Sequence, residues 1–246
     1  MSLNHHAHNM PSPSRTTSGF TLIEMAIVLI ILTLVVGGAL VPLGAQIEQR
    51  RRAETQKSLD ETKEALIGYA IANKALPCPS TLSGGAPTGI AASSCSTTST
   101  GYLPWATLGV TRQDAWGNLL RYAVSPGYTT NPFTLTTSRT LTIASRDNSG
   151  APINITKSSD IPALVLSVGK NGYGGMSADF IAQSGVPANN PDEKQNISNG
   201  ASTYYSRTPS PSGTAASLGG EFDDMVVWIS PNVLFNRMVA AGQLSN

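Results

Sequence analysis

Histidine is nearly absent from this sequence, and its absence excludes several kinds of site. The chain has only three histidines, His5, His6 and His8, and all of them lie within the first 19 residues. If that segment is removed from the mature protein, catalysis by a Ser–His or Cys–His pair is excluded, and so is any zinc site with a histidine ligand. Chemistry based on Asp, Glu or Lys stays open. No other type of metal ligand accompanies the three histidines, so we interpret them as part of a disordered polar tail.

Charged residues are also scarce. They make up 13% of the chain, and Lys+Arg 16 against Asp+Glu 15 leaves a net charge of +1. This balance does not indicate a polyanion-binding surface, so no nucleic-acid partner is predicted. Gly, Ser, Thr, Asn and Pro are abundant instead, which is typical of an extracytoplasmic, loop-rich domain that contains β-structure. With 246 residues, of which 40% are hydrophobic, the chain can form a membrane anchor and one domain with its own core.

One segment lacks charge almost completely. Between Phe20 and Val41 the only charged residue is Glu24, in a run dominated by Leu, Ile, Val, Ala and Gly. A helix of this length can cross about 30 Å of hydrocarbon, so the run predicts a transmembrane span. A carboxylate inside such a span costs about 2.5–3.5 kcal/mol on insertion scales, which makes Glu24 a functional candidate. The alternative is a simple single-pass anchor whose glutamate reaches the membrane face.

The residues in front of this run do not fit an ordinary secretory signal. Such a signal carries its small-residue cleavage site after the apolar region, whereas here Gly19 precedes it. Residues 18–24, Ser-Gly-Phe-Thr-Leu-Ile-Glu, resemble the processing site of type IV prepilins and type II secretion pseudopilins. The resemblance implies that a membrane aspartic peptidase cuts after Gly19 and N-methylates the new amino terminus, Phe20.

The same resemblance implies a role for Glu24 and a set of partners. The glutamate of the family, fifth in the mature chain, falls on Glu24, and it would pair with the amino terminus of Phe20 in a neighbouring subunit. Burial inside a filament would make this ion pair selective for register. The implied partners are other pilin or pseudopilin subunits, a prepilin peptidase, an inner-membrane assembly platform and membrane lipid. The chain would be a single-pass inner-membrane protein whose C-terminal domain lies in the periplasm or on an extracellular filament.

Four segments follow from these observations. The predicted fold class is α+β: a long N-terminal helix, first transmembrane and then amphipathic, packed on a small antiparallel β-sheet domain of the type IV pilin-like kind. The segments are a cleaved leader over 1–19, a transmembrane or filament-core helix over 20–43, its amphipathic continuation over 44–74, and a globular α+β domain over 75–246.

The amphipathic part of the helix has two different faces. One face carries charges of alternating sign without aromatic residues between them, which indicates a solvated surface and not a nucleic-acid site. Pro42 predicts a kink, and Leu76-Pro77 predicts the end of the helix near Asn73. The other face is apolar at helical spacing and should pack on the domain; it consists of Leu59, Leu66, Ile67, Ala70 and Ile71.

The two cysteines, Cys78 and Cys95, both lie beyond the predicted membrane segment. The periplasm is oxidising, so we predict that they form a disulfide, which would stabilise the fold by about 3 kcal/mol in the chain-entropy model. Two buried free thiols are the alternative. The surrounding segment, 77–101, is rich in Ser, Thr, Gly and Pro and is predicted to be a loop.

The remaining strands are predicted from local patterns. Residues 114–118 form a turn that leads into a strand over 119–124, and they resemble the Asp-Pro-Trp-Gly-Asn segment of major pseudopilins, with Ala115 in place of proline. Alternation of apolar and hydroxyl residues predicts a strand over 133–143, and the apolar run 163–168 predicts a buried strand.

The glycine-rich segment 169–175 invites comparison with a phosphate-binding loop, but the pattern of that loop is absent, so we predict a turn. In position the segment resembles a pseudopilin loop that binds calcium together with an acidic pair in front of the last strand. That resemblance implies a calcium site formed by Asn171, Asp223 and Asp224, with asparagine where the family has aspartate. Carboxylates and carbonyls are suitable calcium ligands. The alternative is a solvated turn with two neighbouring aspartates.

Two features depart from the ordinary major subunit. Residues 176–220 form a polar insertion that we predict to be loop, and Ser230 to Gly242 predict a C-terminal helix. The sequence therefore predicts a structural subunit of a type IV pilin-like filament, most like a type II secretion pseudopilin. A minor pilin of a type IV pilus and a membrane-anchored adhesin or binding module are the alternatives. No catalytic constellation is recognisable, and no enzyme is predicted.

Overall fold

The computed structural model describes residues 19–95 and 99–244, without the side chains of residues 36–43. The predicted leader up to residue 18, with its three histidines, therefore lies outside the described residues. The backbone of Pro42 is helical and lies within α1 (Leu22–Asn73), and the kink predicted there stays a prediction. The chain divides into two compact units between Glu48 and Gln49, and each is described by itself.

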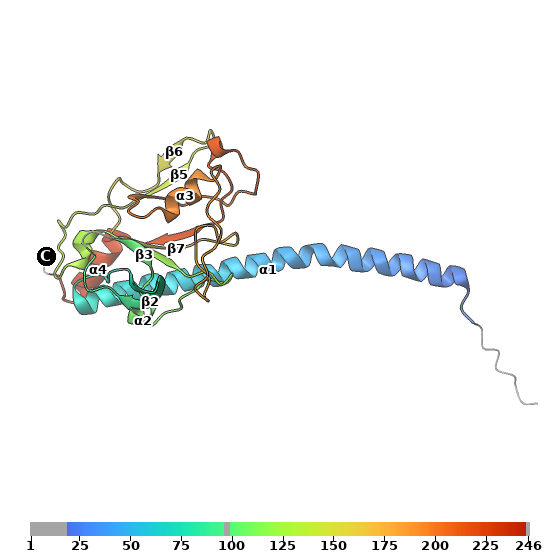
Figure 1. Ribbon diagram of the computed structural model, residues 1–246, viewed down its shortest axis with the longest axis horizontal. Coiled ribbons are helices and arrows are strands. Elements are labelled where there is room, and N and C mark those ends of the chain that lie inside the picture. Colours follow the sequence, from blue (N-terminus) through green and yellow to red (C-terminus); the bar gives the residue numbers. More distant parts are fainter. Residues whose placement is uncertain (1–18, 96–98, 245–246) are drawn as a thin grey trace, which may run out of the picture. The chain divides into compact units, whose positions relative to one another are not determined.

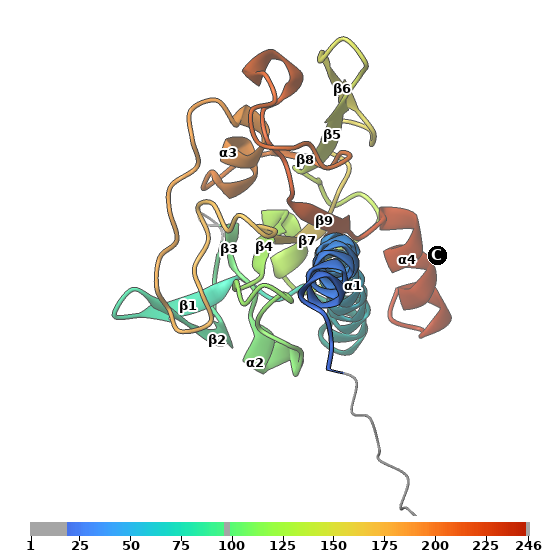
Figure 2. The same cartoon turned by 90° about the vertical axis from the view of Figure 1, so that its right-hand side faces the viewer.

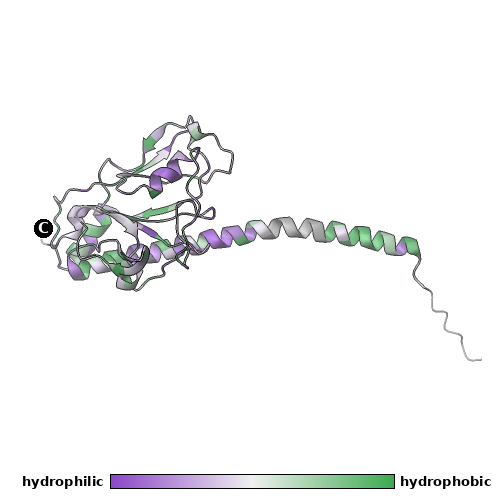
Figure 3. Cartoon of the chain, in the orientation of Figure 1, coloured by the Kyte–Doolittle hydropathy of each residue, from purple (hydrophilic) through white to green (hydrophobic). Residues whose placement is uncertain are grey.

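Helix α1 covers Leu22–Asn73, so the predicted end of the helix at Asn73 is confirmed (Figure 1). In the first unit most of the described side chains of α1 up to Val35 are apolar and exposed, with Glu24 as the charged exception, and Figure 3 shows these turns mainly in the hydrophobic colour. Within the described residues, no helix has both the length and the apolar character needed to cross a membrane.

In the second unit, α1 packs through the apolar face that the sequence predicted. Leu59, Leu66 and Ala70 are fully buried and Ile67 is nearly so, because helical spacing aligns them along one side. The predicted charged face is exposed and carries ion pairs within the helix, Arg50 with Glu54 and Lys57 with Glu61.

The centre of this unit is a four-stranded antiparallel sheet in the order β3-β4-β7-β9, which confirms the predicted α+β class with an antiparallel sheet. The sheet separates two cores. One face packs on the core shared with α1, through Tyr122, Val124, Val165 and Val227. The other face packs on a second core that includes Ile143 and Tyr204, through Ala123, Leu164 and Leu166. The strands are β3 (Thr100–Tyr102), β4 (Arg121–Val124), β7 (Ala163–Ser167) and β9 (Met225–Trp228).

The predicted strand over 133–143 is wrong. Only the last two residues of that range are in a strand, because β5 (Thr142–Arg146) begins at Thr142. Phe133 instead packs on Tyr128, with ring centroids 4.7 Å apart, and Thr137 N donates to Thr134 O to close a turn. The Thr137 hydroxyl also accepts from Thr134 N, at 2.8 Å. Threonine hydroxyls that bond to nearby backbone offer the chain an alternative to a strand, which the alternating pattern does not reveal.

The predicted loop over 77–101 contains a hairpin. Strands β1 (Ser80–Ser83) and β2 (Ala86–Ala91) pair antiparallel around Gly84 and Gly85, which both have positive φ. A Gly-Gly pair suits such a two-residue hairpin turn, because glycine adopts positive φ without a steric cost.

The predicted loop over 176–220 also has regular structure. It contains α3 (Pro191–Ile197), β8 (Thr203–Tyr205) and the 3-10 helix η2 (Ala216–Leu218). Strand β8 pairs parallel with β5, and β5 pairs antiparallel with β6 (Pro152–Asn154). The insertion is therefore part of a second, three-stranded sheet and covers the second core (Figure 2).

The C-terminal helix is confirmed as α4 (Pro231–Ala240), which buries Leu234, Phe235 and Met238 against the first core. The remaining short elements are α2 (Trp105–Leu108) and the 3-10 helix η1 (Pro126–Thr129).

Candidate functional site

The predicted processing residues, Gly19 and Phe20, lie just before α1, which begins at Leu22. Phe20 is 79% exposed. A Cβ atom added at Gly19 would meet nothing within 4 Å in the described part of the chain. Packing among the described residues therefore does not require a glycine at this position. If glycine is required, the reason is recognition by another molecule, such as a peptidase.

Glu24 lies in the first turn of α1 and forms a reciprocal cap with Thr21. Its Oε2 accepts from Thr21 N at 2.7 Å and from the Thr21 hydroxyl at 2.9 Å, and that hydroxyl accepts from Glu24 N at 3.3 Å. This is a capping box, which satisfies backbone donors at the start of a helix. The Thr-x-x-Glu spacing that signals it is present in the sequence, so Glu24 has a local structural role besides the predicted pairing between subunits.

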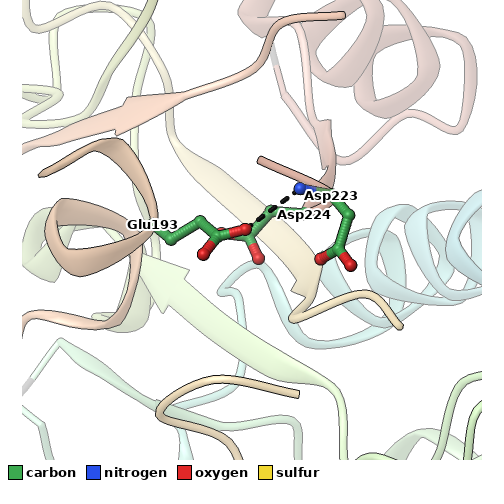
Figure 4. A group of neighbouring side chains, drawn as sticks. All are labelled: Glu193, Asp223 and Asp224. Carbon is green, nitrogen blue, oxygen red and sulfur yellow. Dashed lines mark hydrogen bonds between the residues drawn. The ribbon is translucent and has the colours of Figure 1, made fainter. Parts of the chain in front are cut away.

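A cluster of three buried carboxylates forms the most unusual chemical site of the second unit (Figure 4). Glu193 comes from α3, and Asp223 and Asp224 directly precede β9. One oxygen from each carboxylate lies within 4.8 Å of the others. The sequence predicted Asp223 and Asp224, and the structure brings them close to Asn171 as well, but Glu193 was missed.

Most oxygens of the acidic cluster, defined as Glu193, Asp223 and Asp224, accept hydrogen bonds. Glu193 Oε1 accepts from Asn171 Nδ2 at 2.9 Å and from Asp223 N at 3.0 Å, and its Oε2 accepts from Asn190 Nδ2 at 3.1 Å. Asp223 Oδ2 accepts from Asn171 N at 2.9 Å. Asp223 Oδ1 is buried and has no partner in the described part of the chain. An orphaned buried oxygen of this kind calls for a proton or a cation.

Burial weakens the acidity of all three groups. It raises the pKa of Asp223 to about 7, opposed by the hydrogen bond from Asn171 N and reinforced by the nearby charge of Glu193. Burial also raises the pKa of Asp224 well above its ordinary value, with the charge of Glu193 as the next cause. The pKa of Glu193 is raised as well, chiefly by burial. The cluster therefore favours bound positive charge.

Glycine is required where the loop after β7 approaches the cluster. Gly169 has φ +65°, and a Cβ there would overlap Asp223 Oδ1. The turn at 114–118 supports this loop, since Asn118 Nδ2 donates to Gly169 O at 2.9 Å. Asp114 in turn accepts from the Ser167 hydroxyl at 2.6 Å and from Asn118 N at 2.9 Å. The turn at 114–118 thus positions the backbone that faces the acidic cluster.

Asn171 takes part differently from the prediction of a metal ligand. Its amide nitrogen donates to Glu193, and its amide oxygen accepts from Tyr173 N at 3.0 Å. Asn171 therefore orients a carboxylate, while the carboxylates themselves are the oxygen donors available to an ion. The three carboxylates, one of which has an unpartnered oxygen, are suitable ligands for a hard cation such as Ca²⁺. This ion takes six to eight oxygen ligands.

The predicted disulfide is confirmed. Cys78 and Cys95 are bonded, with their Cα atoms 5.6 Å apart, and both are buried in the first core. The bond connects the segment that follows α1 to the segment that precedes β3.

Comparison with known proteins gives one match. Residues 14–40 match the family described as Prokaryotic N-terminal methylation motif. No curated protein and no solved structure matches the chain. The motif indicates a type IV pilin-like protein and points to a structural subunit. It implies processing by a prepilin peptidase, assembly with other pilin subunits, and a membrane-anchored or filament-associated location.

Proposed function

We propose that this protein is a structural subunit of a type IV pilin-like filament, assembled through its N-terminal helix and most like a type II secretion pseudopilin. The methylation motif at residues 14–40, directly at the start of α1, carries this proposal. The apolar first unit would form the filament core after insertion in the inner membrane, and the second unit would form the surface.

Processing should occur after Gly19. The exposed segment ahead of α1 is accessible to a peptidase, and the glycine has no packing role that a substitution would disturb. Mass spectrometry of the membrane form should show N-methylated Phe20 as the amino terminus, and Gly19→Val should leave the chain uncut. Intact Met1 in the wild type, or cleavage beyond Val41, would remove the basis of the filament proposal.

Two roles of Glu24 can be separated with three variants. Glu24→Val removes both the charge and the cap, Glu24→Gln removes the charge but keeps a side chain that suits a capping box, and Thr21→Val weakens the cap but keeps the charge. If Glu24 pairs with a neighbouring amino terminus, the valine and glutamine variants should both be depleted about tenfold or more from sheared filaments, because a buried ion pair that loses one partner leaves the other charge unpaired.

The threonine variant serves as the matched control. We expect it to enter filaments nearly as well as the wild type, because loss of a cap costs only about 1 kcal/mol. Glu24→Asp should lie between these results, since the shorter side chain fails to reach the neighbouring terminus. Normal incorporation of Glu24→Gln would reduce Glu24 to a helix cap.

Two observations bear on the kind of filament. The loop after β7 contacts the turn at 114–118 on one side and Asp223 of the acidic pair on the other. This arrangement favours a pseudopilin. The insertion 176–220 and α4 favour a minor subunit, of a pseudopilus or of a pilus. Deletion of the gene would distinguish them: loss of protein secretion with intact surface pili supports the pseudopilin, and loss of pili with intact secretion supports the minor pilin. An adhesin would leave both intact and reduce surface binding.

The acidic cluster is proposed to bind Ca²⁺ through Glu193, Asp223 and Asp224. Their separation, their burial and the unpartnered Asp223 Oδ1 support this proposal. An ion there would connect α3 of the insertion to the start of β9, while Asn171 holds Glu193 in place.

A further inference from the structure

One groove on the second unit has walls that include neither residues of the acidic cluster nor the predicted processing residues. It has a volume of about 550 Å³ and lies between hairpin β1–β2 and strand β3, which both views place side by side (Figures 1 and 2). Its walls combine apolar atoms of Leu82 and Cys95 with the hydroxyls of Ser80 and Ser94. This size falls in the range of sites that enclose a small ligand or a few residues of a peptide.

One wall of the groove is the open edge of the central sheet. Strand β3 is the first strand of that sheet and pairs only with β4 within the described part of the chain. Leu103 N donates to Leu120 O at 3.0 Å, and Val124 N donates to Ser99 O at 2.8 Å. Because hydrogen bonding alternates along an antiparallel pair, the N–H and C=O groups of Thr100 and Tyr102 point away from β4, toward the groove side.

The groove contains a single charged side chain, Arg121. The residue is 8% exposed and its guanidinium lies 5.5 Å from the centre of the Tyr102 ring. Its Nη2 donates to Ile197 O at 3.1 Å and, more weakly, to Asn199 Oδ1 at 3.5 Å. Among the described residues, Nε and Nη1 have no acceptor, and no carboxylate lies within ion-pair distance of this arginine, although its charge opposes the rise in the pKa of Asp224. A largely buried guanidinium therefore keeps two donor groups for a ligand.

From these observations we infer that the groove binds an extended peptide segment of a partner protein, with an acidic side chain that pairs with Arg121. The peptide adds to β3 as a fifth strand, and its backbone bonds to Thr100 and Tyr102. Tyr102 lies opposite Arg121 in the register, so both side chains are on the same face of the sheet. A peptide residue paired with Tyr102 would thus direct its side chain to the face that carries the guanidinium. Strand addition supplies affinity, and the arginine supplies the preference for a carboxylate.

The test uses the purified full chain in detergent and three blocked peptides. The first is Ac-Thr-Val-Glu-Val-Thr-NH₂, the second has glutamine in place of glutamate, and the third is the first with all backbone amides N-methylated. Binding is measured by isothermal titration calorimetry. We expect the glutamate peptide to bind at least about tenfold more tightly than the glutamine peptide, because charge-assisted hydrogen bonds are about twice as strong as neutral ones. The N-methylated peptide should not bind, because it cannot pair with a strand.

Two variants complete the test. Arg121→Met should remove the preference for glutamate, whereas Arg237→Met, an exposed arginine outside the groove, should keep it. Equal affinity for the first two peptides, undiminished binding of the N-methylated peptide, or no binding of any peptide at millimolar concentration would each overturn the inference. These three outcomes are read on the wild type, so they stand even if Arg121→Met fails to fold.

Discussion

Replacing Asp192 with alanine should lower the free energy of unfolding of the second unit by about 3–5 kcal/mol, because it leaves two largely buried arginines without their counter-charge. The Asp192 side chain is fully buried. Arg146 donates to it from Nη2 at 2.6 Å, and Arg207 donates from Nε at 2.7 Å. The two guanidinium groups also lie over aromatic rings, Tyr205 and Phe222, and their side chains are only 14% and 9% exposed.

The loss should be structural, since this ion triad connects β5, α3 and the chain after β8. Urea denaturation followed by tryptophan fluorescence measures it. Asp160→Ala is the matched control: Asp160 pairs with Arg139, but 26% of its side chain is exposed, so its removal should cost about 1 kcal/mol or less. A loss below about 1 kcal/mol for Asp192→Ala would show that the insertion is not held by this triad.

The stability of the metal-free protein should fall as the pH rises from about 4 to about 7, and calcium should reverse that fall. In the folded protein the pKa of Asp223 is about 7, whereas an exposed aspartate in the unfolded chain titrates near 4. Between these values the folded state holds a proton that the unfolded state has released. The corresponding stability is fully present below pH 4 and is lost as the pH rises through 7.

If Ca²⁺ binds the acidic cluster, it competes with the proton for the same carboxylates. At pH 8, 10 mM Ca²⁺ should stabilise the fold by about 1.4–2.7 kcal/mol, for a Kd of about 10⁻³ to 10⁻⁴ M. At pH 5 the effect should be much smaller, because Asp223 is protonated. Melting temperatures with calcium and with a chelator, at both pH values, measure this difference.

Asp223→Asn should flatten the pH dependence and abolish the calcium effect. Asp179→Asn is the control, since Asp179 is exposed on the neighbouring loop and outside the cluster. If the melting temperature at pH 8 is the same with millimolar calcium and with chelator, the site does not bind calcium, and the acids are held by protonation and hydrogen bonds alone.

Local sequence was sufficient for the features that depend on a few neighbouring residues. The methylation motif, the end of α1 before Leu76-Pro77, the apolar face of α1 from Leu59 to Ala70, and the helix α4 after Ser230 were all predicted. Each depends on side-chain spacing or on a proline, and these act over one or two turns of chain. The disulfide was predictable because only two cysteines exist and both lie in the same short segment.

Tertiary structure decided the rest. The Thr137 hydroxyl bonds to the backbone of Thr134, and a turn forms where a strand was predicted. The polar insertion acquires α3 and β8 because they cover the second core. Glu193 could not be found from sequence, because its role depends on the packing of α3 against a segment 30 residues away. The same holds for the direction of the Asn171 amide and for the open donors of Arg121. A sequence determines which groups are available locally, but the partner that a buried polar group finds depends on which distant segments the core brings together.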